Sequence, residues 1–299
     1  MKKTSIWRGY FTAGLVLLLA GCGPREEAPG EVETFVIALK PDKDPDAMLA
    51  ERGELEAWLG DELGRPVDVI IPASGSVIEQ GLANGTIDAA YVSSTSLARY
   101  REAGVADLLL AVEIEGQTFY QSYWVTLKEN PYRSVEDLAG TAVCFASPTS
   151  TSGYIIPTHD LYLKGLIDEN SGPAGHFGAG NVLYGTGYVS AIERVFNGQA
   201  EAAAVSDYVI EEDKHLTEEE KGRLRVVQAQ GPVPTHCLAV RSSLSSKDMA
   251  ELKTAFLALN GTDPALRDTV FTSVLKEVDP DEHLAPIEEA LRFVQALSE

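Results

Sequence analysis

The stretch that decides the fold is Ser76–Ser93, SVIEQGLANGTIDAAYVS, because Val189–Ser206, VSAIERVFNGQAEAAAVS, repeats its plan. In each stretch, apolar residues at helical spacing lead to an Asn-Gly pair, and a short apolar run then ends in serine. Glycine at such a position takes the left-handed conformation that ends a helix. Each copy predicts a helix, a turn and a buried strand, and the repetition predicts two similar lobes.

Apolar runs of strand length alternate with amphipathic runs of helical length along the rest of the chain. This alternation predicts an α/β fold in which each lobe is a largely parallel sheet flanked by helices. Ligands of parallel sheets bind beyond the carboxyl ends of the strands, so we expect a ligand cleft between the lobes, lined by hydroxyls such as those of residues 93–96. The expected strands lie within residues 34–39, 66–72, 88–93, 106–114, 122–127, 141–146, 181–185, 202–206, 224–228 and 237–241.

The N-terminal residues predict export and lipid anchoring. Basic residues precede an apolar run, residues 13–21, that is too short to span a membrane permanently. The run ends in LAGC, so residues 1–21 are predicted to be a lipoprotein signal peptide and Cys22 the lipid-modified residue; a plain signal peptide is the alternative. Residues 22–33 are predicted to be a flexible tether. We therefore expect a cell-envelope lipoprotein, anchored in a membrane and facing the periplasm or the outside.

The charge of the chain limits its partners. The formal net charge is −21 at pH 7, and removal of the signal peptide takes away basic residues and no acidic ones. Nucleic-acid binding requires basic patches and is not expected. An anionic ligand gains nothing from this overall charge, so local hydrogen-bond donors must hold it.

Metal and disulfide signals are weak. The histidines show no paired metal-ligand spacing and the chain has no C-x-x-C, so neither a metal site nor a cofactor is predicted. Cys144 and Cys237 lie in apolar runs and are predicted to be buried free thiols. A disulfide between them in an oxidising envelope is the alternative.

Residues 146–162, ASPTSTSGYIIPTHDLY, place four hydroxyls in succession before Gly153. A strand precedes this stretch, and Pro157 suits the start of the helix that follows, where its missing N–H costs nothing. The first N–H groups of a helix, here those of about residues 151–156, lack helical partners. Together with the helix dipole and the hydroxyls they form a neutral cradle for an oxyanion. An ordinary Ser/Thr helix cap is the alternative.

Serine-based catalytic motifs are absent from this turn. No glycine lies two residues before Ser150 or Ser152, as a nucleophile elbow requires. The turn has no lysine to reach a phosphoryl group and no S-x-x-K. The protein is therefore not predicted to be an enzyme.

SPTSTSGYIIP resembles the P-N-S-T-S-G-[YF]-x-x-P signature of the phosphonate- and phosphite-binding proteins of ABC importers, with Thr149 at the Asn position. The resemblance extends over roughly residues 34–290 and includes FYQSYWVTLKENPYRSVEDLAG, which resembles the family's Y-x-S-x-x-x-x-x-K stretch. It implies a two-lobed type II periplasmic-binding fold that closes on its ligand. Lobe 1 would comprise residues 34–115, lobe 2 residues 116–231, and the return to lobe 1 with the C-terminal helices residues 232–299.

The resemblance also implies ligand-binding residues. Ser150, Thr151 and Ser152 match the positions that hold the phosphoryl oxygens. Tyr120 matches a tyrosine before a second-lobe strand, and Tyr91 matches the aromatic position at the end of a first-lobe strand. Either tyrosine can alternatively be a core aromatic residue.

Two further ligand-binding candidates, Tyr188 and His236, depart from the family pattern, and Asp207 is a third candidate. Tyr188 stands where many members have a histidine, and a phenol donates a hydrogen bond without adding charge. His236 stands where aminoalkyl-phosphonate binders have an acid, so a ligand carrying an amine is disfavoured. Asp207 can accept a hydrogen bond from a singly protonated oxyanion and so reject sulfate-like ligands. Packing roles for Tyr188 and His236, and a solvated position for Asp207, are the alternatives.

These features predict the substrate-binding lipoprotein of an ABC importer. Its ligand would be a small phosphorus oxyanion (phosphite, phosphate or a small phosphonate) and its partners a permease and the ATPase of that permease. A ligand-sensing receptor for the same anions is the alternative function.

Overall fold

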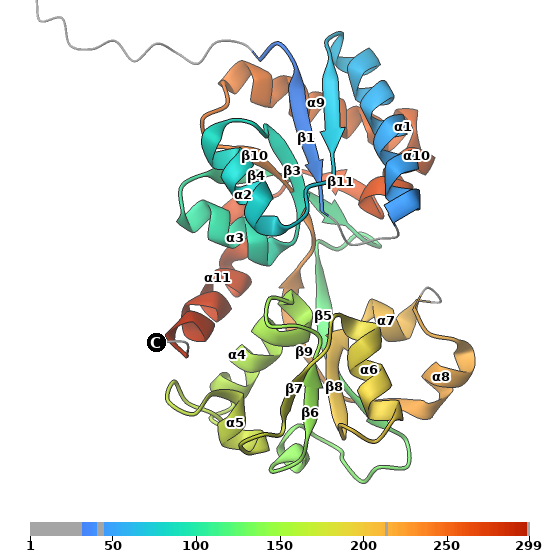
Figure 1. The fold of residues 1–299 in the computed structure, drawn as a ribbon, viewed down its shortest axis with the longest axis vertical. Coiled ribbons are helices and arrows are strands. Elements are labelled where there is room, and N and C mark those ends of the chain that lie inside the picture. The colour runs from blue at the N-terminus through green and yellow to red at the C-terminus, as the bar shows by residue number, and fades with distance from the viewer. Residues whose placement is uncertain (1–31, 41–44, 213–214, 298–299) are drawn as a thin grey trace, which may run out of the picture.

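The computed structural model describes residues 32–40, 45–212 and 215–297 (Figure 1). The predicted signal peptide, Cys22 and nearly all of the predicted tether lie outside these residues, so those expectations stay predictions. Within the described ranges, no helix combines the length and apolar character needed to cross a membrane.

The first sheet has the strand order β11-β4-β10-β3-β1-β2. β1 pairs in parallel with β2 and β3, whereas β10 is antiparallel to β3 and β4, and β11 is antiparallel to β4. The strands are β1 (Phe35–Leu39), β2 (Val67–Ile70), β3 (Ala89–Val92), β4 (Ala106–Glu113), β10 (Cys237–Arg241) and β11 (Val274–Lys276).

The second sheet has the strand order β7-β6-β8-β5-β9. β6 pairs in parallel with β7 and β8, whereas β5 is antiparallel to β8 and β9. The strands are β5 (Phe119–Leu127), β6 (Val143–Phe145), β7 (Val182–Tyr184), β8 (Ala202–Ser206) and β9 (Leu224–Pro234).

Helices cover both faces of each sheet, because successive strand residues point to opposite sides and both sides are apolar. On the first sheet, α1 (Pro45–Leu63), α9 (Ser246–Thr262) and α10 (Pro264–Phe271) pack on one face, and α2 (Gly75–Asn84) and α3 (Ser94–Glu102) on the other. On the second sheet, α6 (Tyr188–Phe196) and α7 (Tyr208–Glu211) cover one face, and α4 (Ile156–Leu163) and α5 (Gly172–Phe177) the other. The remaining helices are η1 (Glu136–Leu138), η2 (Thr151–Ile155), α8 (Glu218–Arg223) and α11 (Pro280–Ala296).

The repeated stretches form equivalent units, α2–β3 in the first sheet and α6–β8 in the second. β3 lies between a parallel neighbour and an antiparallel one, and β8 occupies the same position in its own sheet. Gly85 and Gly198 follow the two helices with φ of 79° and 67°, the left-handed conformation predicted for them. The predicted two-lobed α/β fold is confirmed.

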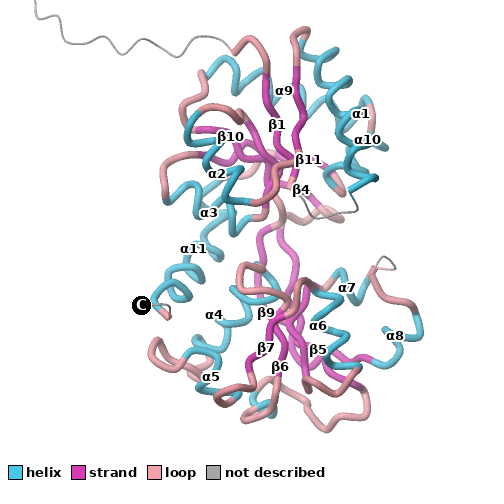
Figure 2. Tube along the Cα trace, viewed as in Figure 1, coloured by secondary structure: helices cyan, strands magenta, loops and turns pink. Residues whose placement is uncertain are grey.

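Among the described strands, parallel pairing is confined to β2-β1-β3 and β7-β6-β8. The antiparallel half of each sheet contains the strands that connect the lobes, since β4 of the first sheet continues into β5 of the second and β9 returns into β10 (Figure 2). Each sheet is therefore mixed rather than largely parallel as expected, because a strand that arrives from the other lobe enters in the opposite direction. β11 was not among the expected strands; it has only three residues and one buried apolar side chain, too short a pattern to predict a strand.

The two connections between the lobes are joined to each other at Thr235. Its Oγ1 donates to the Val112 carbonyl oxygen at 2.6 Å, and its N–H donates to the Thr118 carbonyl oxygen at 3.1 Å. The Val112 N–H in turn donates to the carbonyl oxygen of His236 at 2.9 Å. These bonds hold the crossing segments side by side.

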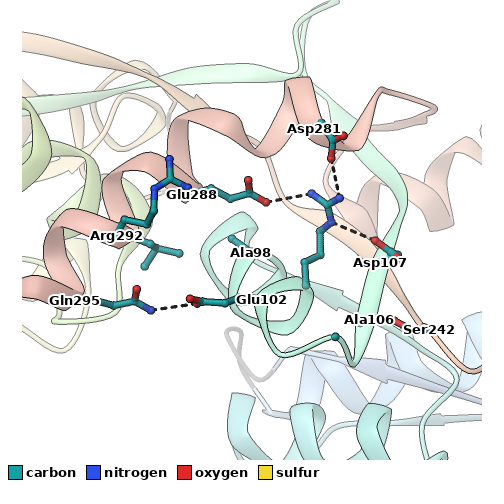
Figure 3. A pocket seen from close by; sticks show the side chains of 12 residues that line it. Ala98, Glu102, Ala106, Asp107, Ser242, Asp281, Glu288, Arg292 and Gln295 are labelled. Atoms are coloured by element: carbon teal, nitrogen blue, oxygen red, sulfur yellow. Dashed lines mark hydrogen bonds and ion pairs between the residues drawn. The ribbon is translucent and has the colours of Figure 1, made fainter.

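Helix α11 extends from the first lobe to the second (Figure 1). On the first lobe, Arg101 of α3 forms ion pairs with Asp281 at 2.8 Å and Glu288 at 3.1 Å, beside a pocket of about 420 Å³ between α3 and α11 (Figure 3). On the second lobe, the ring of Phe293 stacks on Tyr162 of α4 with centroids 4.1 Å apart. One helix thus packs against both lobes.

Cys144 and Cys237 are both buried free thiols, as the sequence predicted. They lie on β6 and β10, strands of different sheets. Burial raises the pKa of the Cys144 thiol to about 11 and that of Cys237 further, so both stay protonated and unreactive.

Candidate ligand-binding site

The hydroxyl-rich turn is the capped start of a helix. Ser150 is the N-cap residue, and its Oγ accepts the N–H of Gly153 at 3.1 Å. The N–H groups of Ile155 and Ile156 donate to the carbonyls of Ser150 and Thr151, five residues earlier, which makes the first turn wider than an α-helical turn.

Pro157 explains why the next carbonyls of the turn bond outside the helix. It lies in the first turn of α4 and has no N–H to offer to Ser152 or Gly153. Ser122 Oγ on β5 donates to the Ser152 carbonyl oxygen at 2.6 Å, and the Ala146 N–H donates to the Gly153 carbonyl oxygen at 3.0 Å. The turn is thereby attached to β5 and to the residue that directly follows β6.

Gly153 is required by close packing. A Cβ at this position would lie 2.4 Å from the Cβ of Ala146, 2.8 Å from Ser150 Oγ and 3.1 Å from a ring carbon of Tyr188. Any larger residue would therefore displace the turn from the end of β6.

The bonded carbonyls determine where the free donors point. In a trans peptide, C=O and N–H point in opposite directions, so the N–H groups of Thr151, Ser152 and Tyr154 point away from the helix. The expectation of unpaired N–H groups at about residues 151–156 was wrong for Ile155 and Ile156, because the wide turn pairs them, and for Gly153, because Ser150 caps it.

Four of the predicted ligand-binding side chains meet at this turn. Ser152 Oγ lies 2.8 Å from the hydroxyl of Tyr188, and Ser150 donates to the same hydroxyl at 3.4 Å. The Tyr120 hydroxyl donates to Ser152 Oγ at 3.3 Å. These residues come from the turn, from the start of α6 and from β5, and the structure brings them together as a cluster of hydroxyls.

The cluster donates hydrogen bonds without formal charge. Burial, with the nearby Tyr188 and Asp207, raises the pKa of Tyr120 well above its usual value. Tyr120 therefore keeps its proton across the physiological range and remains a donor.

The first lobe contacts the turn through α3. Thr95, the second residue of α3, lies with its Oγ1 2.7 Å from Oγ1 of Thr151, and both side chains are buried. Ser93 caps α3, and Ser94 donates to the Pro234 carbonyl oxygen at 2.9 Å. The sequence indicated hydroxyls at residues 93–96 without selecting Thr95; the signal was a run of small donors directly after a buried strand.

Tyr91 and His236 form a separate pair on the first lobe, with ring centroids 5.5 Å apart. Tyr91 is 6% exposed and points to the face covered by α10, where its hydroxyl donates to the Phe271 carbonyl oxygen at 3.4 Å. It also contributes to the raised pKa of Tyr120, so it lies within electrostatic range of the hydroxyl cluster. Its contacts are those of a core aromatic residue at the border of the site.

Asp207 directs its carboxylate mainly at the backbone. Its oxygens accept the N–H groups of Gln121 at 2.7 Å and Tyr208 at 2.8 Å, and Ser206 Oγ at 3.2 Å. Burial raises its pKa, and these hydrogen bonds oppose that rise. The observed role of Asp207 is to fasten the end of β8 to β5 at the border of the hydroxyl cluster.

Comparison with known proteins agrees with this geometry. Residues 37–283 match the family described as ABC transporter, phosphonate, periplasmic substrate-binding protein. The phosphate-import protein PhnD of Mycolicibacterium smegmatis is 25% identical over 256 residues, covering 82% of this chain and 79% of that protein.

Two solved structures show the same fold. XAC2383 from Xanthomonas citri, bound to chloride ion, has a TM-score of 0.77 at 17% identity and covers 88% of this chain and 99% of its own. PhnD1 from Prochlorococcus marinus, in complex with methylphosphonate, has a TM-score of 0.70 at 17% identity with the same coverage of 88% and 99%. Both confirm the type II periplasmic-binding fold. The match over residues 37–283 shows that the chain belongs to the phosphonate family of periplasmic substrate-binding proteins of ABC transporters.

Proposed function

We propose that this protein binds a small phosphorus oxyanion at Ser150, Thr151 and Ser152 and delivers it to the permease. The observation that carries the proposal is the convergence of outward N–H groups and hydroxyls from the turn, α6 and β5. Membership in a family of periplasmic substrate-binding proteins of ABC transporters implies a location in the cell envelope and, as partners, a permease and its ATPase.

The turn offers an oxyanion several donors at once. Three backbone N–H groups point outward at a helix start, where the dipole favours negative charge. Ser152 Oγ hydrogen-bonds to the hydroxyls of both Tyr120 and Tyr188, and each of these three hydroxyls can turn its proton to a phosphoryl oxygen instead. Thr95 and Thr151 contribute from the two lobes, so closure of the lobes surrounds the ligand.

Phosphite, phosphate and small phosphonates are the ligands of this proposal. The relative from Mycolicibacterium smegmatis is named for phosphate import, and the Prochlorococcus marinus structure holds methylphosphonate. The two first-lobe candidates, His236 and Tyr91, pack against each other, and neither is the carboxylate that an ammonium group needs. The proposed ligand therefore carries no amine.

Asp207 is proposed to select a protonated oxyanion. Oδ1 already accepts from Tyr208 and Ser206, whereas Oδ2 accepts only the N–H of Gln121 and keeps a second lone pair for the ligand. Burial raises the pKa of this carboxyl group, so its charge is costly at this position. A hydroxyl on the ligand's phosphorus can donate to it, whereas sulfate has no proton to donate. We therefore expect the protein to bind sulfate more weakly than a protonated phosphorus oxyanion.

We propose that a lipid on Cys22 anchors the protein, because LAGC ends the apolar run 13–21. Mass spectrometry of protein extracted from membranes tests this point directly. A diacylglycerol-modified Cys22 at the N-terminus is the expected result, and an unmodified or differently cleaved N-terminus contradicts it.

Isothermal titration calorimetry of the purified mature protein with phosphite, phosphate, methylphosphonate and sulfate tests the ligand class. We expect binding of at least one phosphorus oxyanion and much weaker binding of sulfate. Absence of binding to all three phosphorus oxyanions would falsify the proposed function.

A further inference from the structure

A chain of polar side chains lies buried beneath the turn. Ser122 on β5 is 0% exposed and Gln230 on β9 is 4% exposed, yet both are hydrogen-bonded. Ser122 Oγ donates to the Ser152 carbonyl oxygen at 2.6 Å, and Gln230 Nε2 donates to Ser122 Oγ at 2.7 Å. Gln228 on β9 continues the chain from Gln230 to Asp160 on α4.

The chemistry of the groups fixes the direction of every bond. Asp160 Oδ2 accepts from Gln228 Nε2 at 2.6 Å, and this amide nitrogen also lies 3.4 Å from Gln230 Oε1. Gln230 therefore turns its NH₂ group, which can only donate, toward Ser122. Because the Ser122 oxygen already accepts, its single proton goes to the Ser152 carbonyl.

The peptide that Ser122 holds is the one between Ser152 and Gly153. Its carbonyl accepts from Ser122 on the inside, and its N–H donates to Ser150 Oγ on the outside. Pro157 leaves this carbonyl without a helical donor, so the side chain from β5 supplies the bond that the helix does not make. Ser152 is thereby anchored through its own carbonyl group, and this anchor determines the position from which its hydroxyl and the N–H of the preceding peptide extend.

We infer that Ser122 and Gln230 are positioning residues of the ligand site: the pair sets its affinity by orienting the 152–153 peptide, without touching the ligand. The inference rests on the proposed function, since affinity for a phosphorus oxyanion is its readout. Ser122 is the serine of the Y-x-S pattern, and the geometry gives that serine a task distinct from ligand contact.

The test compares Ser122→Ala with Thr126→Val. Thr126 lies on the same face of β5, is also 0% exposed, and donates from Oγ1 to the Glu201 carbonyl oxygen at 2.5 Å, away from the turn. Both variants lose a buried hydrogen bond to a main-chain carbonyl, so both should unfold at lower temperature. We expect only Ser122→Ala to weaken oxyanion binding, by roughly tenfold, measured by calorimetry beside thermal unfolding.

A second pair of variants tests the direction of the hydrogen bonds that run from Gln230 through Ser122 to Ser152. Gln230→Glu places a carboxylate oxygen where Nε2 donates, so Ser122 would turn its proton away from Ser152. Gln230→Met removes the donor and leaves Ser122 free to donate to Ser152. We expect the Glu variant to bind the anion more weakly than the Met variant, and both to bind more weakly than wild type.

The outcomes separate the inference from the function it rests on. If the wild-type protein binds none of phosphite, phosphate and methylphosphonate, the proposed function fails. If the wild type binds while Ser122→Ala keeps wild-type affinity, or the two Gln230 variants bind equally, the positioning role is refuted and the function stands. Should Ser122→Ala not fold, the Gln230 variants decide the matter.

Discussion

At the scale of single residues, the site depends on the geometry of one turn. Gly153 lets the turn approach Ala146. Pro157 has no N–H to donate, so the carbonyls of Ser152 and Gly153 accept hydrogen bonds from donors outside the helix. Ser150 caps the turn and also reaches Tyr188. The residue types of the turn therefore determine its shape as well as supplying the proposed contacts to the ligand.

Thr151→Ala combined with Ser152→Ala tests the contribution of the hydroxyls. Each lost hydrogen bond to an anionic ligand costs ~1.5–3 kcal/mol of binding free energy, so affinity should fall by several factors of ten. The fold should survive, since both changes remove only an oxygen or a small group. Calorimetry and thermal unfolding measure the two effects. The exposed neighbour Thr149, changed to Ala, is the control, and equal affinity of the double variant and this control would contradict the site assignment.

Gly153→Ala tests the packing of the turn. A methyl group 2.4 Å from the Ala146 Cβ forces the turn away from β6, which costs about 1–3 kcal/mol of folding free energy and misplaces the donors. Affinity and the unfolding temperature should both fall. Gly53→Ala, in α1 with no atom within 4 Å of the added Cβ, is the control and should leave affinity unchanged. Full affinity of Gly153→Ala would show that the close approach is not required.

At the scale of elements, helix α11 contains a histidine, His283, that is buried where the helix packs against the first lobe. His283 is 2% exposed, lies against Phe119 and has Nε2 3.7 Å from Cys237 Sγ, while its Nδ1 is buried without a partner. Burial lowers its pKa from 6.5 to about 4. The imidazole is therefore neutral in the folded protein at neutral pH.

The lowered pKa predicts a loss of stability in mild acid. Between pH 6.5 and about 4, His283 binds a proton more readily in the unfolded chain than in the folded protein. The free energy of unfolding is therefore not reduced by His283 above pH 6.5, and it decreases as the pH falls through this range. The decline amounts to about 1.4 kcal/mol per pH unit at most. His283→Gln should make the free energy of unfolding, measured by urea denaturation, less dependent on pH in this range. An unchanged pH profile would contradict the assignment.

At the scale of the whole molecule, the lobes are joined by two connecting segments, by α11 and by the pair Thr95–Thr151. Thr235 ties the connecting segments together, and Phe293 fixes the end of α11 to α4. Helix α4 follows directly from the turn at which the ligand is proposed to bind. A change in how α11 packs therefore reaches the element that carries the site.

Phe293→Ala tests how firmly the end of α11 packs against α4. The ring is 7% exposed and stacks on Tyr162, so truncation should cost roughly 3 kcal/mol of folding free energy. Phe293→Leu keeps much of the apolar volume and should cost clearly less. Urea unfolding followed by fluorescence measures both variants, and equal stabilities of the two would show that the helix end does not pack as described.

The sequence alone predicted the features that depend on neighbours along the chain. The repeated helix-turn-strand units, ten of the described strands and the start of α4 at Pro157 follow from hydrophobic periodicity, glycine turns and the missing proline N–H. The cluster of Ser150, Ser152, Tyr120 and Tyr188 was predicted as well, through resemblance to a family rather than through spacing.

The tertiary structure alone decided which distant groups meet. The bonds Ser122 to Ser152 and Thr95 to Thr151, and the attachment of Asp207 to the backbone of Gln121, join residues on different elements. Such pairings depend on strand register and on the docking of one lobe against the other, and no local pattern contains that information. The sequence determined a turn rich in donors, and the packing of β5 and α3 against it determined which way those donors point.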